Sequence, residues 1–309
     1  KKIGNYLLHN QEKSETLKFN FLLYSKALLE LMKPRVMSLV IFTCAVGLLT
    51  SPITISFIDS LIGILFVTMG AGAAGALNMW YEADLDKMMT RTCLRPIPTG
   101  KVNKQHALFF GVLLSIISIF GLYYFANILS ATLLFITISF YLIVYTIWLK
   151  RKTSQNIVIG GVAGALPPVI GWTIATNTLT FEPITFFLII FFWTPSHFWA
   201  LSLYKIDDYK NANIPMLPIT NGIEETKRNI FVYSILMLPI VLIPYFIGFL
   251  SEFYLITSVL ITLYYNYLCY KLLNFQKNKF EIIKARKVFS FSIYYLFLLF
   301  VLILIDKLI

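Results

Sequence analysis

The sequence is short of charged residues. Charged side chains make up 13% of its 309 residues, about half the share that soluble domains carry. Hydrophobic residues make up 58%, and the mean hydropathy is +0.75. The apolar runs are continuous and about 20 residues long, which is typical of membrane-spanning helices and lacks the alternation of a membrane β-barrel. The composition excludes an ordinary soluble domain and predicts an all-α integral membrane protein.

Cysteine is also scarce, and nothing in the sequence resembles a soluble linker. The residues Cys44, Cys93 and Cys269 show no paired spacing, so we expect neither disulfides nor a cysteine metal site. The first 35 residues are polar and basic without an early apolar stretch, so we expect no cleavable signal peptide. The predicted organisation is a basic cytoplasmic tail over residues 1–35 and a single transmembrane domain over residues 36–309.

Nine segments are apolar enough to be predicted as membrane spans. They cover residues 36–52, 57–81, 105–125, 128–149, 155–176, 183–204, 229–249, 253–271 and 288–306. Nine helices of this kind are expected to pack around a central cavity, in which the few polar residues would gather.

Basic residues are distributed very unevenly between the predicted loops. Of the 26 Lys and Arg residues, 25 fall in the segments 1–35, 82–104, 150–152, 205–228 and 271–287. With nine spans these segments all lie on one side, which the positive-inside rule makes cytoplasmic. The amino terminus is therefore expected in the cytoplasm. The net charge of +11 is explained by this bias and needs no nucleic-acid partner.

Three oxygen-bearing side chains with four-residue spacing lie at the end of the second predicted span. Asn78, Glu82 and Asp86 drift by only about 40° per step on a helix and climb about 12 Å along one face. We call these three residues the oxygen ladder, and Asp84 points roughly the other way. Mg²⁺ is commonly held by one or two carboxylates together with substrate phosphate oxygens. The ladder therefore predicts a diphosphate site at the membrane surface, with the hydrocarbon tail of the substrate in the lipid.

A second acidic cluster follows the sixth predicted span. Asp207 and Asp208, with Lys205 close by, are expected to provide a second metal-binding edge. Arg91 and Arg95 follow the ladder, and their guanidinium groups suit phosphate oxygens. The competing interpretation of residues 82–104 is a solvated loop whose acids and bases pair with one another and contribute little.

The first acidic motif resembles that of a known superfamily. It reads Asn78-x-x-x-Glu82-x-x-x-Asp86, followed by Arg91-Thr-x-x-Arg95-Pro, and is similar to the first motif of the UbiA superfamily of intramembrane prenyltransferases. The resemblance runs from about residue 33 to the last span. The superfamily usually has Asp where Glu82 stands, and the longer side chain should still reach a cation.

Two later stretches narrow the resemblance. Thr194-Pro-Ser-His197-Phe-Trp-Ala-Leu and Asp208-Tyr-x-x-Ala-x-Ile-Pro-Met-Leu-Pro218 look like the branch of the superfamily that transfers farnesyl to haem. The second acidic motif of the superfamily is usually Asp-x-x-x-Asp. Neither Asp207 nor Asp208 has an acid four residues later, so the sequence leaves open which of them binds metal.

The resemblance implies a reaction and a set of ligands. The farnesyl group of farnesyl diphosphate would pass to a vinyl group of haem B, and water addition would give haem O. Mg²⁺ would assist the ionisation of the diphosphate, and haem B would be a substrate rather than a cofactor. The implied metal ligands and catalytic residues are Asn78, Glu82, Asp86, Asp207 and Asp208. The implied substrate-binding residues are Arg91, Arg95, Lys150, Arg151, Lys205 and His197.

Two of these residues have a plain structural alternative. Lys150 ends the fourth predicted span, where an ordinary positive-inside anchor is also expected. His197 lies within an apolar span, where a polar side chain is costly and should face the interior. It would either contact haem, as an iron ligand or through the edge of the macrocycle, or make a hydrogen bond between packed helices.

The resemblance also implies a cellular setting, and three other functions remain as alternatives. The expected location is the bacterial inner membrane rather than the mitochondrial one, with hand-over of the product to a haem A synthase or a terminal oxidase assembly. One alternative is a prenyltransferase that acts on an aromatic quinone precursor. Another is a transporter, which would carry ionisable residues at mid-membrane, and a third is an assembly factor for a haem protein.

Overall fold

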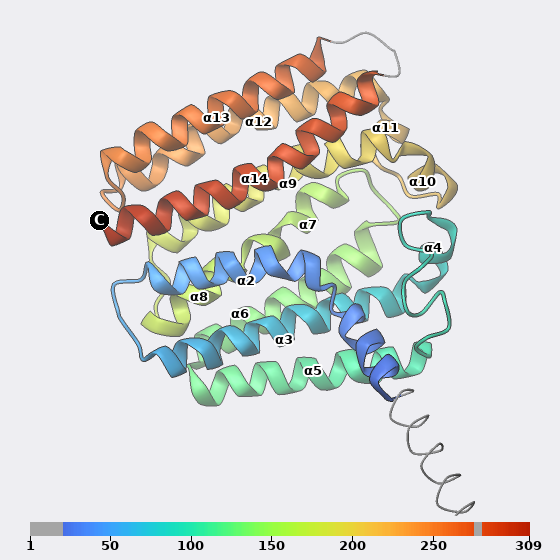
Figure 1. The fold of residues 1–309 in the computed structure, drawn as a ribbon, viewed down its shortest axis with the longest axis horizontal. Helices are drawn as coiled ribbons and strands as arrows, with labels where there is room; N and C mark the ends of the chain where they lie inside the picture. Colours follow the sequence, from blue (N-terminus) through green and yellow to red (C-terminus); the bar gives the residue numbers. More distant parts are fainter. Residues whose placement is uncertain (1–20, 275–279) are drawn as a thin grey trace, which may run out of the picture.

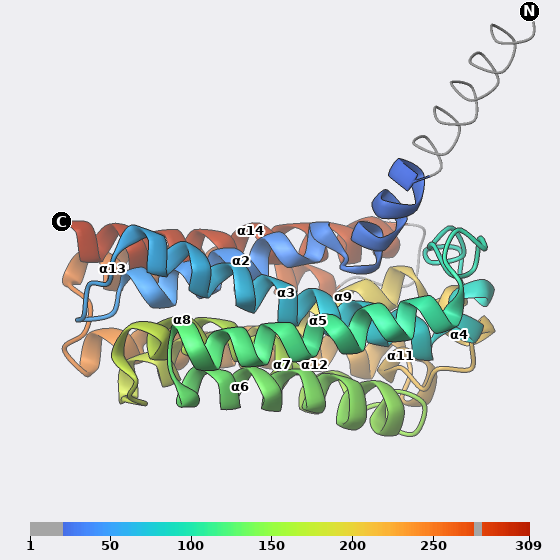
Figure 2. The same cartoon turned by 90° about the horizontal axis from the view of Figure 1, so that it is seen from below.

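The computed structural model describes residues 21–274 and 280–309, and the elements within these ranges are helices with no strand. The long helices run side by side along the molecule (Figures 1 and 2). In chain order the elements are α2 (Pro34–Leu49), α3 (Phe57–Tyr81), α4 (Ala83–Met88), α5 (Lys104–Phe125), α6 (Ile128–Ser139), the π-helix η1 (Phe140–Leu149), α7 (Asn156–Ala165), α8 (Pro167–Thr176), α9 (Phe181–Tyr204), α10 (Ile206–Asn211), α11 (Leu217–Thr220), α12 (Ile223–Phe246), α13 (Glu252–Leu273) and α14 (Phe280–Leu308).

Each predicted span coincides with one helix or with two consecutive helices. The fourth span is α6 followed by η1, and the fifth is α7 followed by α8. Within the described ranges, seven helical segments are long and apolar enough to cross a membrane. The count is up to eight when Phe21–Leu31 and Pro34–Leu49, which meet at a 55° bend, form one span. The all-helical membrane architecture is therefore confirmed, while the number nine stays a prediction.

The predicted amino-terminal tail lies only partly within the described residues. Residues 1–20 fall outside them. The helix Phe21–Leu31 packs Ala27 and Leu31 into a cluster with Ala76 and Met79 of α3. Its other side exposes apolar residues such as Phe21.

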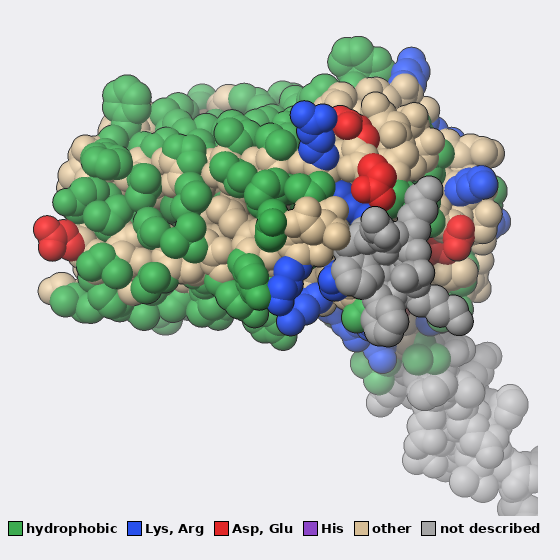
Figure 3. All heavy atoms as spheres, turned by 90° about the horizontal axis from the view of Figure 1, so that it is seen from above, with side chains coloured by type: hydrophobic (Ala, Val, Ile, Leu, Met, Phe, Trp, Pro, Cys, Tyr) green, Lys and Arg blue, Asp and Glu red, His purple; other side chains and the backbone are tan. Residues whose placement is uncertain are grey.

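Charged side chains concentrate at one end of the bundle. The short helices α4, α10 and α11 lie at this end, and the carboxyl terminus lies at the other (Figure 1). On the face in Figure 3, hydrophobic side chains cover the length of the helices, and most of the visible charged side chains gather toward the end with α4 and α10. This distribution fits a bundle whose sides contact lipid and whose charged end contacts water.

Helices α2 and α8 approach each other through two glycines. A Cβ atom on Gly47 would lie 2.0 Å from the Pro168 carbonyl oxygen, and one on Gly171 would lie 2.0 Å from the Cys44 carbonyl oxygen. Small residues of this kind allow membrane helices to pack backbone against backbone. The contact fixes the second half of the broken span α7–α8 against α2.

Replacing Gly171 by Ala tests this close approach. The added methyl group meets the backbone oxygen of Cys44, so the helices must separate, and we expect a loss of stability of about 1–3 kcal/mol. Gly164→Ala is the matched control, because its Cβ would meet nothing within 4 Å and Ala is the better helix former. Thermal unfolding in detergent should lower the midpoint for Gly171→Ala alone, and equal midpoints for the two variants would contradict the packing.

Candidate functional site

The oxygen ladder is buried where α3 passes into α4. Helix α3 ends at Tyr81, and Glu82 forms the junction. The helical hydrogen bonds continue through it, from Glu82 N to Asn78 O at 2.9 Å and from Asp86 N to Glu82 O at 2.8 Å. The register of the three side chains is therefore kept, and Asn78, Glu82 and Asp86 are each only 2% exposed.

Every member of the oxygen ladder contacts a cationic side chain. The contacts join Lys33 Nζ to Asn78 Oδ1 at 2.5 Å, Lys150 Nζ to Glu82 Oε1 at 2.5 Å, and Arg95 Nη1 to Asp86 Oδ1 at 2.8 Å. A buried carboxylate needs such a partner, because an unpaired charge away from water is costly. Three cations from three separate parts of the chain therefore meet at the ladder.

Of the three cations, Lys33 was predicted to lie in the amino-terminal tail and was not expected at the site. It adopts φ 56° and ψ 58° directly before Pro34, a left-handed conformation that is uncommon for a residue with a side chain. Helices usually end at or before a residue that precedes proline, so the Lys-Pro dipeptide was a sign of the bend. Nothing in the sequence indicated that the bend would aim the ammonium group at Asn78.

The π-helix η1 brings further groups to the ladder, including the lysine that follows it. Thr146 Oγ1 accepts a hydrogen bond from Asn78 Nδ2 at 3.1 Å and donates one to Tyr141 O at 2.8 Å. The rings of Tyr141 and Tyr145 stack with centroids 5.4 Å apart. Lys33 Nζ lies 5.9 Å from the Tyr141 centroid, and Lys150 Nζ lies 5.8 Å from the Tyr145 centroid. π-helical segments are rare in proteins, and those that occur often lie at functional sites.

The surrounding cations also set the ionisation of Glu82. Burial acts to raise the pKa of Glu82, but the ammonium group of Lys150 and the charges of Lys33 and Arg95 outweigh it. The pKa of Glu82 is consequently lower than the usual value for a glutamate. The carboxylate therefore stays ionised at neutral pH although it is almost fully buried.

Asp84 and Arg151 form a separate pair on the outer side of α4. Arg151 donates to both carboxylate oxygens, at 3.0 Å and 2.9 Å. Burial acts to raise the pKa of Asp84, and the hydrogen bonds from Arg151 outweigh it, so this pKa is lowered. The pair is largely exposed, with 57% of the Asp84 side chain accessible. Arg151 thus binds Asp84 rather than the ladder. Arg91 is exposed and makes no ion pair within the described part of the chain.

The second acidic cluster joins the first through one threonine. Thr90 Oγ1 donates to Asp208 at 2.7 Å, and the Thr90 backbone N–H donates to the same oxygen at 3.3 Å. Lys205 Nζ lies 3.9 Å from the other oxygen. Asp208 is buried, whereas Asp207 is exposed. The loop after α4 and helix α10 are therefore held together, and the two acidic motifs lie at the same end of the bundle.

The oxygen atoms of the ladder are possible ligands of a metal ion. Among the residues that the structure describes, no three His, Cys, Asp or Glu side chains are close enough to form a metal cage. The ladder offers two carboxylates and one amide oxygen. Mg²⁺ is usually held by one or two carboxylates plus substrate phosphates. The ladder therefore fits a cation that binds together with a diphosphate, and it does not fit a metal bound by protein alone.

His197 lies in α9 between two aromatic rings. The centroid of its ring is 4.3 Å from that of Trp193 and 4.6 Å from that of Phe289, and both pairs are stacked. Its Nδ1 atom is 2.6 Å from Ser292 Oγ of α14. The hydrogen bond between packed helices that the sequence left open is therefore present, on one of the two ring nitrogens.

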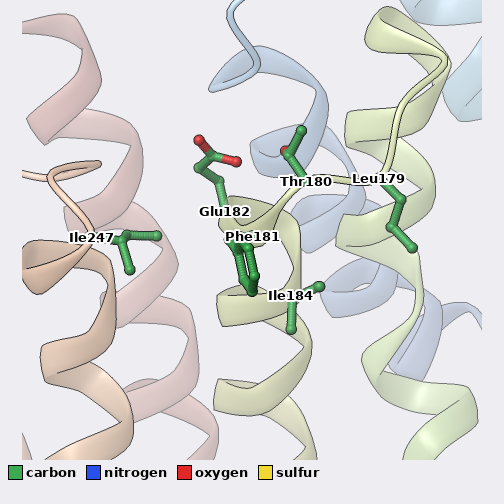
Figure 4. Close-up of a pocket in the computed structure, with 6 residues that line it drawn as sticks. All are labelled: Leu179, Thr180, Phe181, Glu182, Ile184 and Ile247. Carbon is green, nitrogen blue, oxygen red and sulfur yellow. The ribbon is translucent and has the colours of Figure 1, made fainter.

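A surface hollow lies at the amino-terminal end of α9. Its volume is about 520 Å³, and it is lined by Leu179, Thr180, Phe181, Glu182, Ile184 and Ile247 (Figure 4). The lining contains no residue of either acidic cluster. It lies at the start of α9, whereas the second cluster follows the end of that helix, so we do not assign the chemistry to this hollow.

The pairing of Glu82 with Lys150 can be tested by removing one partner. Lys150→Met leaves a buried carboxylate that has lost its closest cation, and we expect a loss of stability of about 3–5 kcal/mol. The double variant Glu82→Gln/Lys150→Met removes both charges and should recover most of this loss without recovering activity. Unfolding midpoints in detergent would measure both effects, and an unchanged midpoint for Lys150→Met would contradict the ion pair.

Comparison with known proteins places these observations in a family. The sequence profile described as "UbiA prenyltransferase family" matches residues 39–293. The "Protoheme IX farnesyltransferase" of Pelagibacter ubique is 66% identical over 98% of this chain and 99% of its own length. The "Protoheme IX farnesyltransferase 2" of Mesorhizobium japonicum is 48% identical over 90% of this chain and 88% of its own length.

Solved structures with low sequence identity have the same fold. A digeranylgeranylglyceryl phosphate synthase aligns with a TM-score of 0.76 and 18% identity, covering 92% of this chain and 98% of its own. A UbiA homologue from Archaeoglobus fulgidus, bound to DMAPP and Mg²⁺, aligns with a TM-score of 0.70 and 16% identity, covering 89% and 99%. With the sequence match over most of its length, the chain belongs to the UbiA prenyltransferase family.

Proposed function

We propose that the chain transfers the farnesyl group of farnesyl diphosphate to a vinyl group of haem B. The names of the sequence relatives support the substrates. The observation in the structure that carries the proposal is the oxygen ladder with its three cations, at the charged end of an otherwise apolar bundle. A diphosphate with a long hydrocarbon tail needs this combination of charge and lipid contact.

The diphosphate would bind among the cations of the ladder. Lys33, Lys150 and Arg95 already converge there, and each can exchange an oxygen of the ladder for a phosphate oxygen. The ladder would hold Mg²⁺, which supplies neutralisation of the charge that develops on the leaving diphosphate. The lysine and arginine donors add hydrogen bonds to the same oxygens, and these bonds strengthen as that charge grows.

The proposed reaction joins two carbon atoms and adds water. The allylic C–O bond of farnesyl diphosphate breaks, and diphosphate leaves with the electron pair. The π electrons of the haem vinyl group then form the new C–C bond. Water attacks the resulting cation and releases one proton, which gives the hydroxyethylfarnesyl product. The stacked rings of Tyr141 and Tyr145, which lie beside the lysines of the ladder, offer π faces that would shield the allylic cation.

The second acidic cluster would act from the other side of the diphosphate. Asp208 is the buried member and is held by Thr90, so we propose Asp208 rather than Asp207 as the group that faces the site. Lys205 and Arg91 belong to the same charged end of the bundle. They would contact phosphate oxygens from the solvent side. Arg151 is occupied by Asp84 and would act only by supporting α4.

The membrane arrangement is part of the same proposal. Nine crossings in the bacterial inner membrane, with a cytoplasmic amino terminus, would place both acidic clusters in the cytoplasm. The uneven distribution of Lys and Arg supports this orientation. The product would then be handed over within the membrane to a haem A synthase or a terminal oxidase assembly.

The activity is tested by incubating the purified protein with haem B, farnesyl diphosphate and Mg²⁺, followed by mass analysis of the haem. We expect farnesylated haem from the wild-type chain. Asp86→Asn should reduce turnover by at least about 100-fold, as loss of a charge-stabilising group does in other enzymes. Asp84→Asn is the matched control on the same short helix and should retain most of the activity. Absence of product from folded wild-type protein would refute the proposed function.

The orientation is tested with single cysteines in a background that lacks the three native ones. Cysteines at Asp84 and Lys210 should both react with a membrane-impermeant thiol reagent only when it reaches the cytoplasmic face. A cysteine at Thr178, between α8 and α9, should react from the opposite face. Labelling of the first two positions from different faces would disprove the nine-span topology.

A further inference from the structure

One ring nitrogen of His197 has no hydrogen-bond partner among the described residues. Its Nδ1 atom is bound to Ser292, while Nε2 has no hydrogen-bond partner among the described residues. Nε2 is also not among the buried polar atoms without a partner, so it retains accessible surface although the residue as a whole is 7% exposed.

The contacts of Ser292 determine which nitrogen of His197 carries the proton. Ser292 Oγ lies 2.6 Å from Phe289 O and 2.6 Å from His197 Nδ1, and a serine hydroxyl has one proton to donate. A carbonyl oxygen cannot donate, so the contact with Phe289 O requires the serine proton. The contact with His197 must then be a hydrogen bond from Nδ1–H to Oγ. Nε2 is consequently the unprotonated nitrogen, with a lone pair.

The ring is also held in a fixed orientation. Trp193 and Phe289 stack on its two faces, and the Trp193 indole N–H donates to Ser292 O at 2.8 Å. The same serine therefore anchors the histidine and one of its stacking partners. An imidazole with a fixed ring and an N–H donated to a neighbouring oxygen is the arrangement found in histidines that bind metals.

We propose that His197 Nε2 is an axial ligand of the iron of the haem substrate, and that Ser292 is the positioning residue that fixes its tautomer. This inference rests on the proposed function, because the iron is brought by the substrate. His197 lies eight residues before Lys205, so the iron would sit about 12 Å from the cytoplasmic end of α9.

The binding of haem without farnesyl diphosphate tests the ligand. Purified protein is titrated with haem B and, separately, with iron-free protoporphyrin IX. His197→Ala should lose the imidazole-type absorption spectrum of bound haem, and added imidazole should restore that spectrum. Its affinity for haem should fall, while its affinity for the iron-free macrocycle should stay unchanged. Equal losses for both macrocycles would indicate a packing role and overturn the proposal.

The role of Ser292 is tested with a matched pair of serines. Ser292→Ala should lower haem affinity by about 10–100-fold, the usual effect of removing the partner of a metal-binding histidine, and should shift the Fe–His vibration of reduced haem in resonance Raman spectra. Ser292→Thr keeps the hydroxyl and should restore both. Ser202→Ala is the control, because Ser202 is buried in α9 and its hydroxyl donates to Trp199 O within the same helix.

The outcomes separate this inference from the proposed function. Wild-type protein that produces farnesylated haem, but whose haem spectrum and affinity do not change in His197→Ala and Ser292→Ala, would refute iron ligation alone. Wild-type protein that neither binds haem nor produces farnesylated haem would refute the proposed function as well.

Discussion

Carboxylates buried at the edge of an apolar bundle must have cations beside them, and this requirement organises the charged end of the molecule. Glu82 is almost fully buried and remains ionised because Lys150 contacts both of its oxygens. Asp86 is also buried and forms an ion pair with Arg95. Removing either carboxylate or either cation would leave a buried charge without a partner, which costs several kcal/mol.

The local distortions of the chain follow from this arrangement. The left-handed conformation of Lys33 and the 55° bend beside it bring one ammonium group to Asn78. The π-helix η1 ends directly before Lys150 and places Thr146 on the other side of the same amide. Both are unusual backbone features, and such features persist where surrounding contacts hold them, often at functional sites. Here both supply partners to the oxygen ladder.

The sequence predicted the helices well because lipid imposes a strong constraint. Long apolar runs have to be helical in a membrane, so the nine predicted ranges coincide with helices in the structure. The four-residue spacing of Asn78, Glu82 and Asp86 also survives the junction of α3 and α4. Asp84 was expected to point away from the ladder, and it is exposed on the outer side.

The partners of the ladder were harder to predict, because they come from distant parts of the chain. Lys33 is 45 residues from Asn78, and Thr90 is 118 residues from Asp208. A single sequence contains no information on such pairings unless they share a local motif. The last turns of the fourth span form the π-helix η1, and its residues are as apolar as those of an ordinary span, so their composition did not distinguish it. Arg151 was grouped with the implied diphosphate ligands, yet the structure pairs it with Asp84.

The central claim is that a prenyl diphosphate binds among the oxygen ladder and its three cations. The most direct test is a cryo-electron microscopy map of the protein in lipid nanodiscs, with Mg²⁺ and the non-ionising analogue farnesyl thiolodiphosphate. The account predicts density for the diphosphate within hydrogen-bond distance of Lys33, Lys150 and Arg95, with metal density against Glu82 and Asp86. Diphosphate density elsewhere, with the ladder and its cations still paired as they are here, would contradict it.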